Sequence, residues 1–264
     1  MPGRKRPTPW EKEYRENWQQ EQKFLRDHAE ERVSPLDRKL DELAPEALSE
    51  TLHAAFMKAF ELVFQKGTGV ISWAGRQKDR RMDAQIRQYK VDIRENRRNL
   101  RAFSRAAGRS GLGNTLAAGA AGAGMGLLGV ALPDVPLFTA MLLKSVYETA
   151  ESFGFGHETP DERRFILLVI GTALCSGAEL EEGDRCLNEF IQTGAWQPDV
   201  PPLDAQLRDT ARRLSEAVLY GKVLQNIPVV GVAGGVRDGV LVRRVQKYAA
   251  VKYRRRFLLA RRTD

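Results

Sequence analysis

An all-α fold is predicted for this chain by three features of its sequence. Apolar residues recur at helical spacing through most of the 264 residues, residues typical of helix starts and ends separate these stretches, and no stretch keeps the alternation of a half-buried strand. We therefore expect a single helical domain over residues 37–264, preceded by an amphipathic docking helix within residues 1–36. A strand is an alternative only within two glycine-rich apolar segments, which we expect to be packed helices.

The composition indicates an anionic partner and a reduced compartment. The net charge is +8 and the sequence pI is about 9.6, which suits nucleic acid or acidic lipid. Cys175 and Cys186 have no CxxC spacing, so a disulfide scaffold is not expected. The charged start of the chain is followed by polar sequence, so no signal peptide is expected either. No stretch has the composition of a conventional membrane span.

Two helices are expected in the first quarter of the chain. Within residues 9–32, Trp10, Tyr14 and Trp18 recur every four residues and form one narrow apolar stripe on an otherwise charged helix. A second helix begins near Pro45, because proline suits a first helical turn. Its wide apolar face is made by Leu48, Leu52, Ala55, Phe56, Ala59, Phe60, Val63 and Phe64.

The second half of the chain predicts four more helices after a turn at Gly154. Thr159 can accept a hydrogen bond from a free backbone N–H, and Glu162 completes a capping box. The stretch FILLVIGTAL that follows is apolar nearly all round, which predicts a buried helix ending at Gly177. The other helices are expected over residues 183–192, over residues 204–225 and from Pro228 onward.

Positive charge is concentrated in two blocks. Residues 76–109 hold twelve Lys or Arg against four acids, and residues 237–264 hold ten against two, so each block has a net charge of +8. Since the whole chain also carries +8, the remainder carries −8. The first block keeps a rough helical period and predicts a long amphipathic basic helix.

Each basic block borders an uncharged glycine-rich segment. The first segment runs from Gly111 to Pro133 and, after Asp134, continues to Leu143; the second opens the final helix. Glycine costs about 1 kcal/mol in a helix relative to alanine, so its abundance needs a reason. Glycines four residues apart leave a groove that another helix can approach closely, in a membrane or in a soluble core. The residues expected to pack against a membrane or a partner are Gly122, Gly126, Leu127, Leu128, Pro133, Pro136, Phe138, Pro228, Gly231, Gly235 and Gly239.

The positions of the two basic blocks predict contact with an anionic surface. One block precedes the first apolar segment and the other follows the second, so both would lie on one side of a bilayer, as the positive-inside bias predicts. The alternative is an exposed helix whose arginines are simply solvated. The residues expected to contact the surface are Arg94, Arg97, Arg98, Arg101, Arg105, Arg243, Arg244, Lys247, Arg254, Arg255 and Arg256. Nucleic acid is disfavoured, because no helix-turn-helix, zinc-finger or RNA-recognition signature accompanies them.

Catalytic motifs are scarce in this sequence. No HExxH zinc site, GxSxG elbow or phosphate-binding loop occurs, so neither a metal nor a cofactor is expected. His157, Glu158 and Asp134 form the one cluster that would support a hydrolase. Cys175 lies on the buried helix, where packing is a better interpretation than nucleophilic attack.

Three stretches together resemble the EcsC family of bacterial proteins. They are LPDVPLF after the first glycine-rich run, FGFGHETPDERRFILLVI, and IPVVGVAGGVRDGVLVRRVQKYAAVKYRRRFL. The resemblance extends over about residues 14–259, and the order of the stretches makes it specific. The family is named after a protein encoded beside an ABC transporter, so it implies a membrane partner of that kind. It implies no catalytic residues.

We expect from these features a non-enzymatic bacterial accessory protein in the cytoplasm, bound peripherally to the inner face of the cell membrane. Anionic lipid is the expected ligand, and an ABC transporter or a secretion-related protein is the expected protein partner. A soluble helical interaction module without membrane contact is the alternative, in which the glycine-rich helices form the protein's own core.

Overall fold

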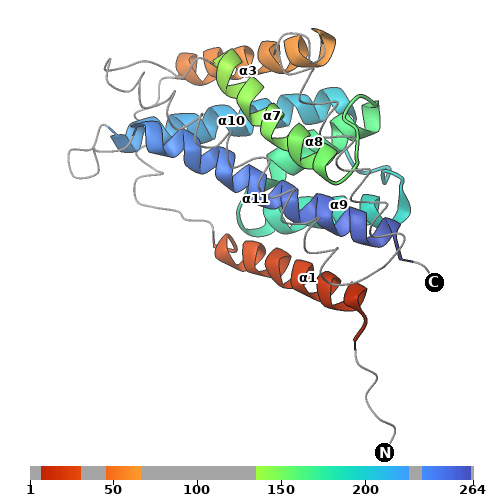
Figure 1. Ribbon diagram of the computed structural model, residues 1–264. Helices are drawn as coiled ribbons and strands as arrows, with labels where there is room; N and C mark the ends of the chain where they lie inside the picture. The colour runs from red at the N-terminus through yellow and green to blue at the C-terminus, as the bar shows by residue number, and fades with distance from the viewer. Residues whose placement is uncertain (1–6, 31–45, 67–134, 226–233, 263–264) are drawn as a thin grey trace, which may run out of the picture.

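Seven helices and no strand make up the part of the chain that the computed structural model describes, residues 7–30, 46–66, 135–225 and 234–262 (Figure 1). This confirms the predicted all-α fold. The helices are α1 (Pro9–Asp27), α3 (Glu46–Lys66), α7 (Val135–Ser152), α8 (Pro160–Leu174), α9 (Gly177–Thr193), α10 (Leu203–Gln225) and α11 (Gly234–Ala260).

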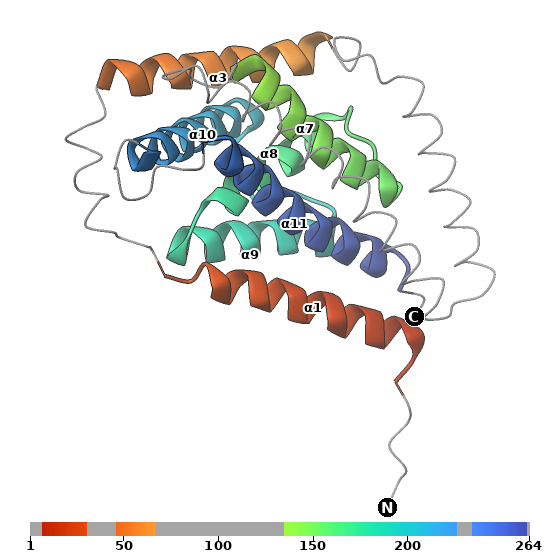
Figure 2. The ribbon, with the colours of Figure 1, turned by 60° about the vertical axis from the view of Figure 1, so that its left-hand side comes forward.

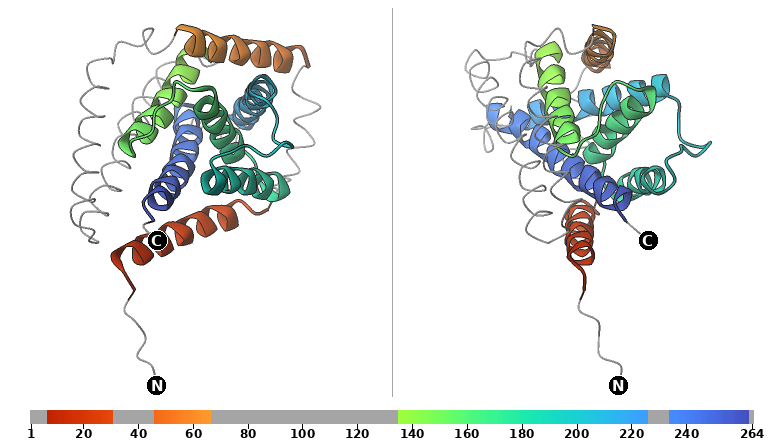
Figure 3. Two further views of the ribbon diagram at one scale, coloured as in Figure 1. Left: turned by 90° about the vertical axis from the view of Figure 1, so that its right-hand side faces the viewer. Right: turned by 45° about the vertical axis from the view of Figure 1, so that its right-hand side comes forward.

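The helix α11 is the axis of this arrangement. It contacts α1, α7, α8, α9 and α10, and α1 and α3 lie on opposite sides of the molecule with the other helices between them (Figures 1 and 2). Both α7 and α11 begin in the half of the molecule nearer α3 and run toward the half nearer α1 (Figures 2 and 3). The described chain therefore resumes, after each of the two undescribed stretches that precede α7 and α11, in the same half of the molecule.

The core is built from the apolar helix faces that the sequence predicts. Phe56 and Phe60 of α3 are fully buried, and Phe56 packs edge-on against Phe138 of α7 with ring centroids 6.1 Å apart. Helix α8 is buried nearly all round, as expected for a central helix. The predicted inner face of α10 is also confirmed, since its four members are buried: Leu207, Ala211, Leu214 and Val218.

The inner face of α1 agrees with the prediction only in part, since Trp10 and Tyr14 of the apolar stripe pack partly buried against the core. The buried residues of α1 are Glu13, Asn17, Glu21 and Phe24, whereas Trp18 of the predicted apolar stripe is 49% exposed. The reason is the surface it meets, because α11 presents cations here and carboxylates are the side chains that can be buried against them. A capping box at Thr8, with its side chain accepting from Glu11 N–H and Glu11 accepting from Thr8 N–H, begins the helix.

Two predicted helix boundaries also need correction. Helix α9 begins at Gly177 rather than at residue 183, because Gly177 takes a left-handed φ of 56° that reverses the chain and starts a new helix. At the start of α8, Thr159 accepts from Glu162 N–H at 3.2 Å as predicted. The side chain of Glu162, which the predicted capping box would turn back to the cap, binds Arg256 instead.

The first basic block and the first glycine-rich run up to Asp134 lie outside the described residues. So do Pro228 and Gly231. The predicted separation into residues 1–36 and 37–264 stays a prediction, although α1 packs on α11 within the described fold.

The crossing of α8 and α9 generates the first testable prediction. A Cβ at Gly183 would lie 2.2 Å from Thr172 Oγ1 and 3.0 Å from Thr172 Cβ, and the helices would have to separate. We expect Gly183→Ala to lower the free energy of unfolding by about 1–3 kcal/mol, despite the better helix propensity of alanine. Urea denaturation followed by circular dichroism measures this.

Gly171→Ala on α8 is the matched control, because its Cβ would meet nothing closer than Thr210 Oγ1 at 3.4 Å. The double variant Gly183→Ala with Thr172→Ala removes the two closest contacts, with Oγ1 and Cγ2, and leaves the approach of the residue 172 Cβ at 3.0 Å, so it should recover part of the loss. Equal stability of the two single variants would contradict this account of the crossing.

Candidate functional site

The exposed cations of α11 lie on one stripe near its start. Val240, Arg243 and Lys247 are exposed and are spaced three and four residues apart, so they share one face of the helix. We call these three residues the exposed row. Among the described residues, no acid pairs with Arg243 or Lys247. The opposite face of this stretch, with Val242 and Val245, is fully buried.

The later cations of α11 face α1 and are buried. Arg254 binds Glu13, and Arg255 donates to Glu21 at 2.7 Å. Lys252, which is 0% exposed, binds the other oxygen of Glu21. We call Lys252, Arg254 and Arg255 the covered cations. They face Glu13 and Glu21 of α1, and this contact combines ion pairs with the packing of the partly buried Trp10 and Tyr14.

Helix α9 completes the network around Lys252. The ammonium group of Lys252 also binds Asp184 and donates to Asn188 Oδ1 at 2.9 Å. Asn188 donates in turn to Glu21 and Asp184, each at 2.9 Å, and Tyr248 donates to Asp184 at 2.7 Å. Three helices therefore share one buried charge cluster whose members satisfy one another.

The two acids of this cluster respond to it in opposite directions. Burial alone raises the pKa of Glu21, but the charges of Lys252 and Arg255 outweigh it and lower the pKa to about 2. For Asp184 burial prevails over the attraction of Lys252 and raises the pKa above its ordinary value. Glu21 is therefore the firmly ionised partner of the covered cations.

Arg256 occupies a separate aromatic site. Its guanidinium donates to both oxygens of Glu162 on α8, at 2.9 and 2.5 Å. The same group lies 4.3 to 5.3 Å from the ring centroids of three phenylalanines, which are Phe155, Phe165 and Phe190. A bidentate ion pair held among aromatic faces is a fixed structural link between α8 and α11.

These contacts show where part of the predicted anionic-surface set lies within the fold. Arg254, Arg255 and Arg256 form ion pairs inside the fold and do not face solvent as a free surface. Arg244 is half-buried and donates to the Cys175 carbonyl at 2.6 Å. Arg243 and Lys247 are exposed as the prediction requires. Its other members lie outside the described residues: Arg94, Arg97, Arg98, Arg101 and Arg105.

The predicted packing residues are only partly described. Phe138 is buried against Phe56 in the protein's own core rather than presented to a membrane or a partner. Pro136 lies in the first turn of α7, and Gly235 and Gly239 lie in the first turns of α11. Outside the described residues lie Gly122, Gly126, Leu127, Leu128, Pro133, Pro228 and Gly231.

The cluster predicted for a hydrolase is centred on a buried histidine. His157 is 6% exposed, stacks on Tyr147 with ring centroids 4.2 Å apart, and lies 3.4 Å from the buried Glu151. Glu158 is 3.9 Å away on its outer side, and Asp134 lies outside the described residues. Because the imidazole is covered on both sides, a substrate could reach it only after the loop between α7 and α8 had moved.

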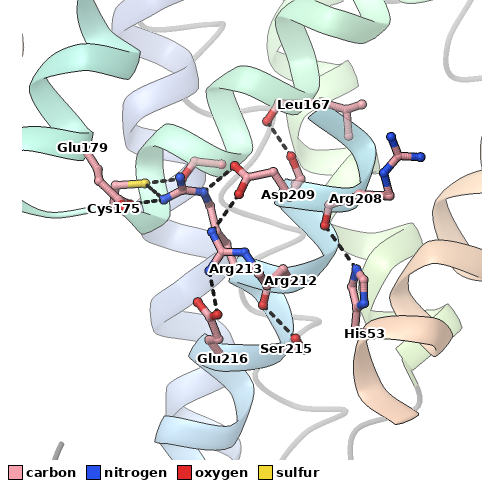
Figure 4. A network of polar contacts seen from close by, with 12 residues as sticks. His53, Leu167, Cys175, Glu179, Arg208, Asp209, Arg212, Arg213, Ser215 and Glu216 are labelled. Atoms are coloured by element: carbon pink, nitrogen blue, oxygen red, sulfur yellow. Dashed lines mark hydrogen bonds and ion pairs between the residues drawn. The ribbon is translucent and has the colours of Figure 1, made fainter. Parts of the chain in front are cut away.

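Cys175 lies in the polar network between α8, α9 and α10 (Figure 4). Arg213 reaches from α10 to Cys175 and Glu179, and its Nε donates to Asp209 at 2.6 Å. Burial raises the pKa of Cys175 to about 12 in spite of the nearby charge of Arg213. The thiol is therefore protonated at neutral pH, which agrees with the packing role that the sequence predicts.

Two further kinds of site are absent from the part of the chain that the structure describes. No group of three or more His, Cys, Asp or Glu residues there is arranged to hold a metal ion. None of the helices in these ranges combines the length and the apolar character needed to cross a membrane.

Comparison with known proteins places the chain in a family. The model of the EcsC protein family matches residues 11–258, which include most of α1, the buried charge cluster and the exposed row. The chain belongs to the EcsC protein family. The resemblance read from the sequence is thereby confirmed. No curated protein and no solved structure matches this EcsC family chain.

The acids of α1 are the site residues that sequence reasoning missed in this EcsC family protein. Glu13, Asn17 and Glu21 recur every four residues, the same spacing as the aromatic stripe beside them. This polar stripe, taken together with the dense cations of residues 252–256, was the sequence signal that could have predicted the contact. Two helix faces of opposite charge and matching length are expected to dock on each other.

The charge cluster predicts how stability depends on pH. Because the pKa of Glu21 is lowered to about 2 from 4.5, its contribution is complete above the unfolded value and is lost as the pH falls toward the folded one. Asp184, whose pKa is raised, has the opposite sign and partly offsets this. We expect wild type to lose on the order of 2 kcal/mol of this contribution between about pH 5 and about pH 3.

Urea denaturation of wild type and Glu21→Gln at both pH values measures this contribution. The variant should be less stable at neutral pH and should depend less on pH, since the titrating group is gone. Glu216→Gln removes an exposed ion pair with Arg212 and should leave both properties nearly unchanged. Identical pH dependence in wild type and Glu21→Gln would contradict the assignment.

The two thiols should differ in reactivity. Cys186 is half-buried and burial raises its pKa only to about 11, against about 12 for the more deeply buried Cys175. Alkylation of the folded EcsC family protein should therefore modify Cys186 faster than Cys175, with a rate ratio of about tenfold or more. Peptide mass spectrometry measures this, and unfolding in urea should abolish the difference. Preferential labelling of folded Cys175 would show that its network opens readily.

Proposed function

We propose that this EcsC family protein binds an anionic membrane surface peripherally, without a catalytic role, and that the exposed row of α11 contacts the surface. The observation that carries the proposal is the split among the cations of α11. The later cations are paired inside the fold, whereas Arg243 and Lys247 have no partner among the described acids and stand beside the 54% exposed Val240. Two cations on the same helix face as an exposed apolar side chain suit a headgroup region.

The position of the exposed row in the chain supports the same function. It follows the uncharged glycine-rich stretch that opens the final helix, and α7 follows the other one. The described parts that follow the two stretches, α7 and α11, begin in the same half of the molecule (Figure 2). Each cation near an anionic surface adds about 1 kcal/mol to the free energy of binding. Arg243 and Lys247 alone would therefore bind weakly, and firm binding also needs the first basic block, residues 76–109, with its net charge of +8.

The cellular setting is part of the proposal and is suggested by the resemblance to the EcsC family. A bacterial cytoplasmic protein of this kind would act at the inner face of the cell membrane, beside a transporter or a secretion-related protein. An ABC transporter is the first protein partner to test, because the resemblance to the EcsC family implies it.

Vesicle flotation tests the proposal. Wild type should float with vesicles of equal parts phosphatidylcholine and phosphatidylglycerol and should stay behind with phosphatidylcholine alone. Arg243→Glu with Lys247→Glu should reduce recovery with the anionic vesicles by about tenfold or more, since four units of charge change at the surface. Added salt should reduce wild-type recovery as well.

The matched control makes the same change of charge elsewhere. Arg15 and Lys23 are exposed on α1, whose buried side is turned toward α11. Arg15→Glu with Lys23→Glu should therefore float nearly as wild type does. Equal losses in the two double variants would mean that net charge alone matters. No recovery of wild type with either vesicle would favour a soluble interaction module instead.

A further inference from the structure

The contact between α1 and α11 is built unlike the rest of the core. Ion pairs also join α11 to α8 and α9, but those contacts lie among buried aromatic and aliphatic side chains. Here three polar residues of α1, Glu13, Asn17 and Glu21, occupy the buried face against the covered cations. Phe24, near the end of α1, is its one buried apolar residue. Trp10, Tyr14 and Leu25 pack partly buried against the core, and Trp10 donates to the Leu258 carbonyl at 2.7 Å. Electrostatic complementarity is therefore the distinctive part of this interface.

Such an interface is costly to separate only if nothing replaces the lost partners. Burying ion pairs removes water from both charges, and the attraction recovers little more than that cost. The fit here is also incomplete, since Asn17 Oδ1, Arg254 Nε and Arg255 Nε are buried without a hydrogen bond among the described residues. An anionic surface that supplies new partners to the cations would therefore compete directly with α1.

We infer that α1 is a displaceable cover over a second anion-binding face of α11, and that anionic phospholipid headgroups take its place on Arg254 and Arg255. This inference rests on the proposed membrane function and adds a mode of regulation to it. The guanidinium groups of Arg254 and Arg255 match phosphate oxygens as well as carboxylates. Lys252 keeps Asp184 and Asn188 of α9 as partners when α1 leaves, so displacement frees two arginines and keeps Lys252 neutralised.

The geometry places this face on the helix that bears the exposed row. Both sets of cations belong to α11, and the covered cations begin five residues after Lys247 in the same continuous helix. A membrane held by the exposed row would therefore lie close to the edge of α1. The acidic inner face of α1 would leave the anionic surface by repulsion, which favours the open state further.

Two pairs of substitutions test the inference, because both break the Arg254–Glu13 and Arg255–Glu21 ion pairs, from opposite sides. Glu21→Gln also removes one partner of Lys252, which keeps Asp184. Glu13→Gln with Glu21→Gln loosens α1 and keeps the cations, so half-maximal flotation should need about fivefold less anionic lipid than wild type. Arg254→Gln with Arg255→Gln loosens α1 and removes the cations, so it should need at least as much lipid as wild type. If both variants gained affinity equally, or neither did, the inference would be wrong.

Hydrogen exchange on unmodified wild type keeps the test independent of any variant that misfolds. With the equal mixture of phosphatidylcholine and phosphatidylglycerol, backbone amides of α1 should exchange about tenfold faster or more, while α8 keeps its protection. Phosphatidylcholine vesicles and dissolved inorganic phosphate should leave α1 protected. Unchanged protection of α1 on protein that floats would overturn the inference and leave the proposed function standing. Opening by phosphate alone would overturn the membrane as the occupant.

Failure of wild type to float would instead remove the proposed function itself, and the inference with it. Flotation and exchange at α1 are separate readouts, so the two failures are distinguishable.

Discussion

The placement of charge within α11 is the constraint on which the described fold depends. A helix that carries Lys252, Arg254, Arg255 and Arg256 within five residues cannot enter a core unless acids from other helices meet each cation. The structure supplies them from three directions, with Glu13 and Glu21 on α1, Asp184 on α9 and Glu162 on α8.

This requirement explains the positions of the surrounding helices. Helix α8 is apolar nearly all round, yet its first turn bears Glu162, and that carboxylate fixes the end of α8 that touches α11. Helix α9 turns Asp184 and Asn188 inward while its outer side keeps exposed ion pairs, such as Arg185 with Glu182. Surface pairs of that kind contribute little, so the inward ones determine how the helices are arranged.

The sequence predicts the helices better than it predicts their neighbours. Apolar periodicity is a local property, and it gives α3, α8 and α10 close to their observed ends. The inner face of α1 is not a local property, because Glu21 is buried only through partners on α9 and α11 that lie far away in the chain. The same limitation explains Arg254 and Arg255, which resemble free surface cations until their partners are placed.

The predicted boundary between two helices was wrong where a single glycine belongs to the end of one and the start of the next. Gly177 ends the apolar run of α8 and also begins α9, and its N–H donates to the His28 carbonyl at 3.1 Å. A glycine marks a change of direction in a sequence, but its neighbours decide whether a helix resumes at once. The residues 178–182 contain three glutamates and favour helix, which was the overlooked local signal.

The polar inner face of α1 has a consequence for the order of assembly during synthesis. Lys252 and Glu21 are separated by 231 positions, and Arg254 and Glu13 by 241, so the ribosome makes α1 long before its binding surface exists. An apolar face exposed to water for that time would promote aggregation. Carboxylates and an amide remain well hydrated, so the buried face of α1 can remain in water without aggregating until α11 has been synthesised.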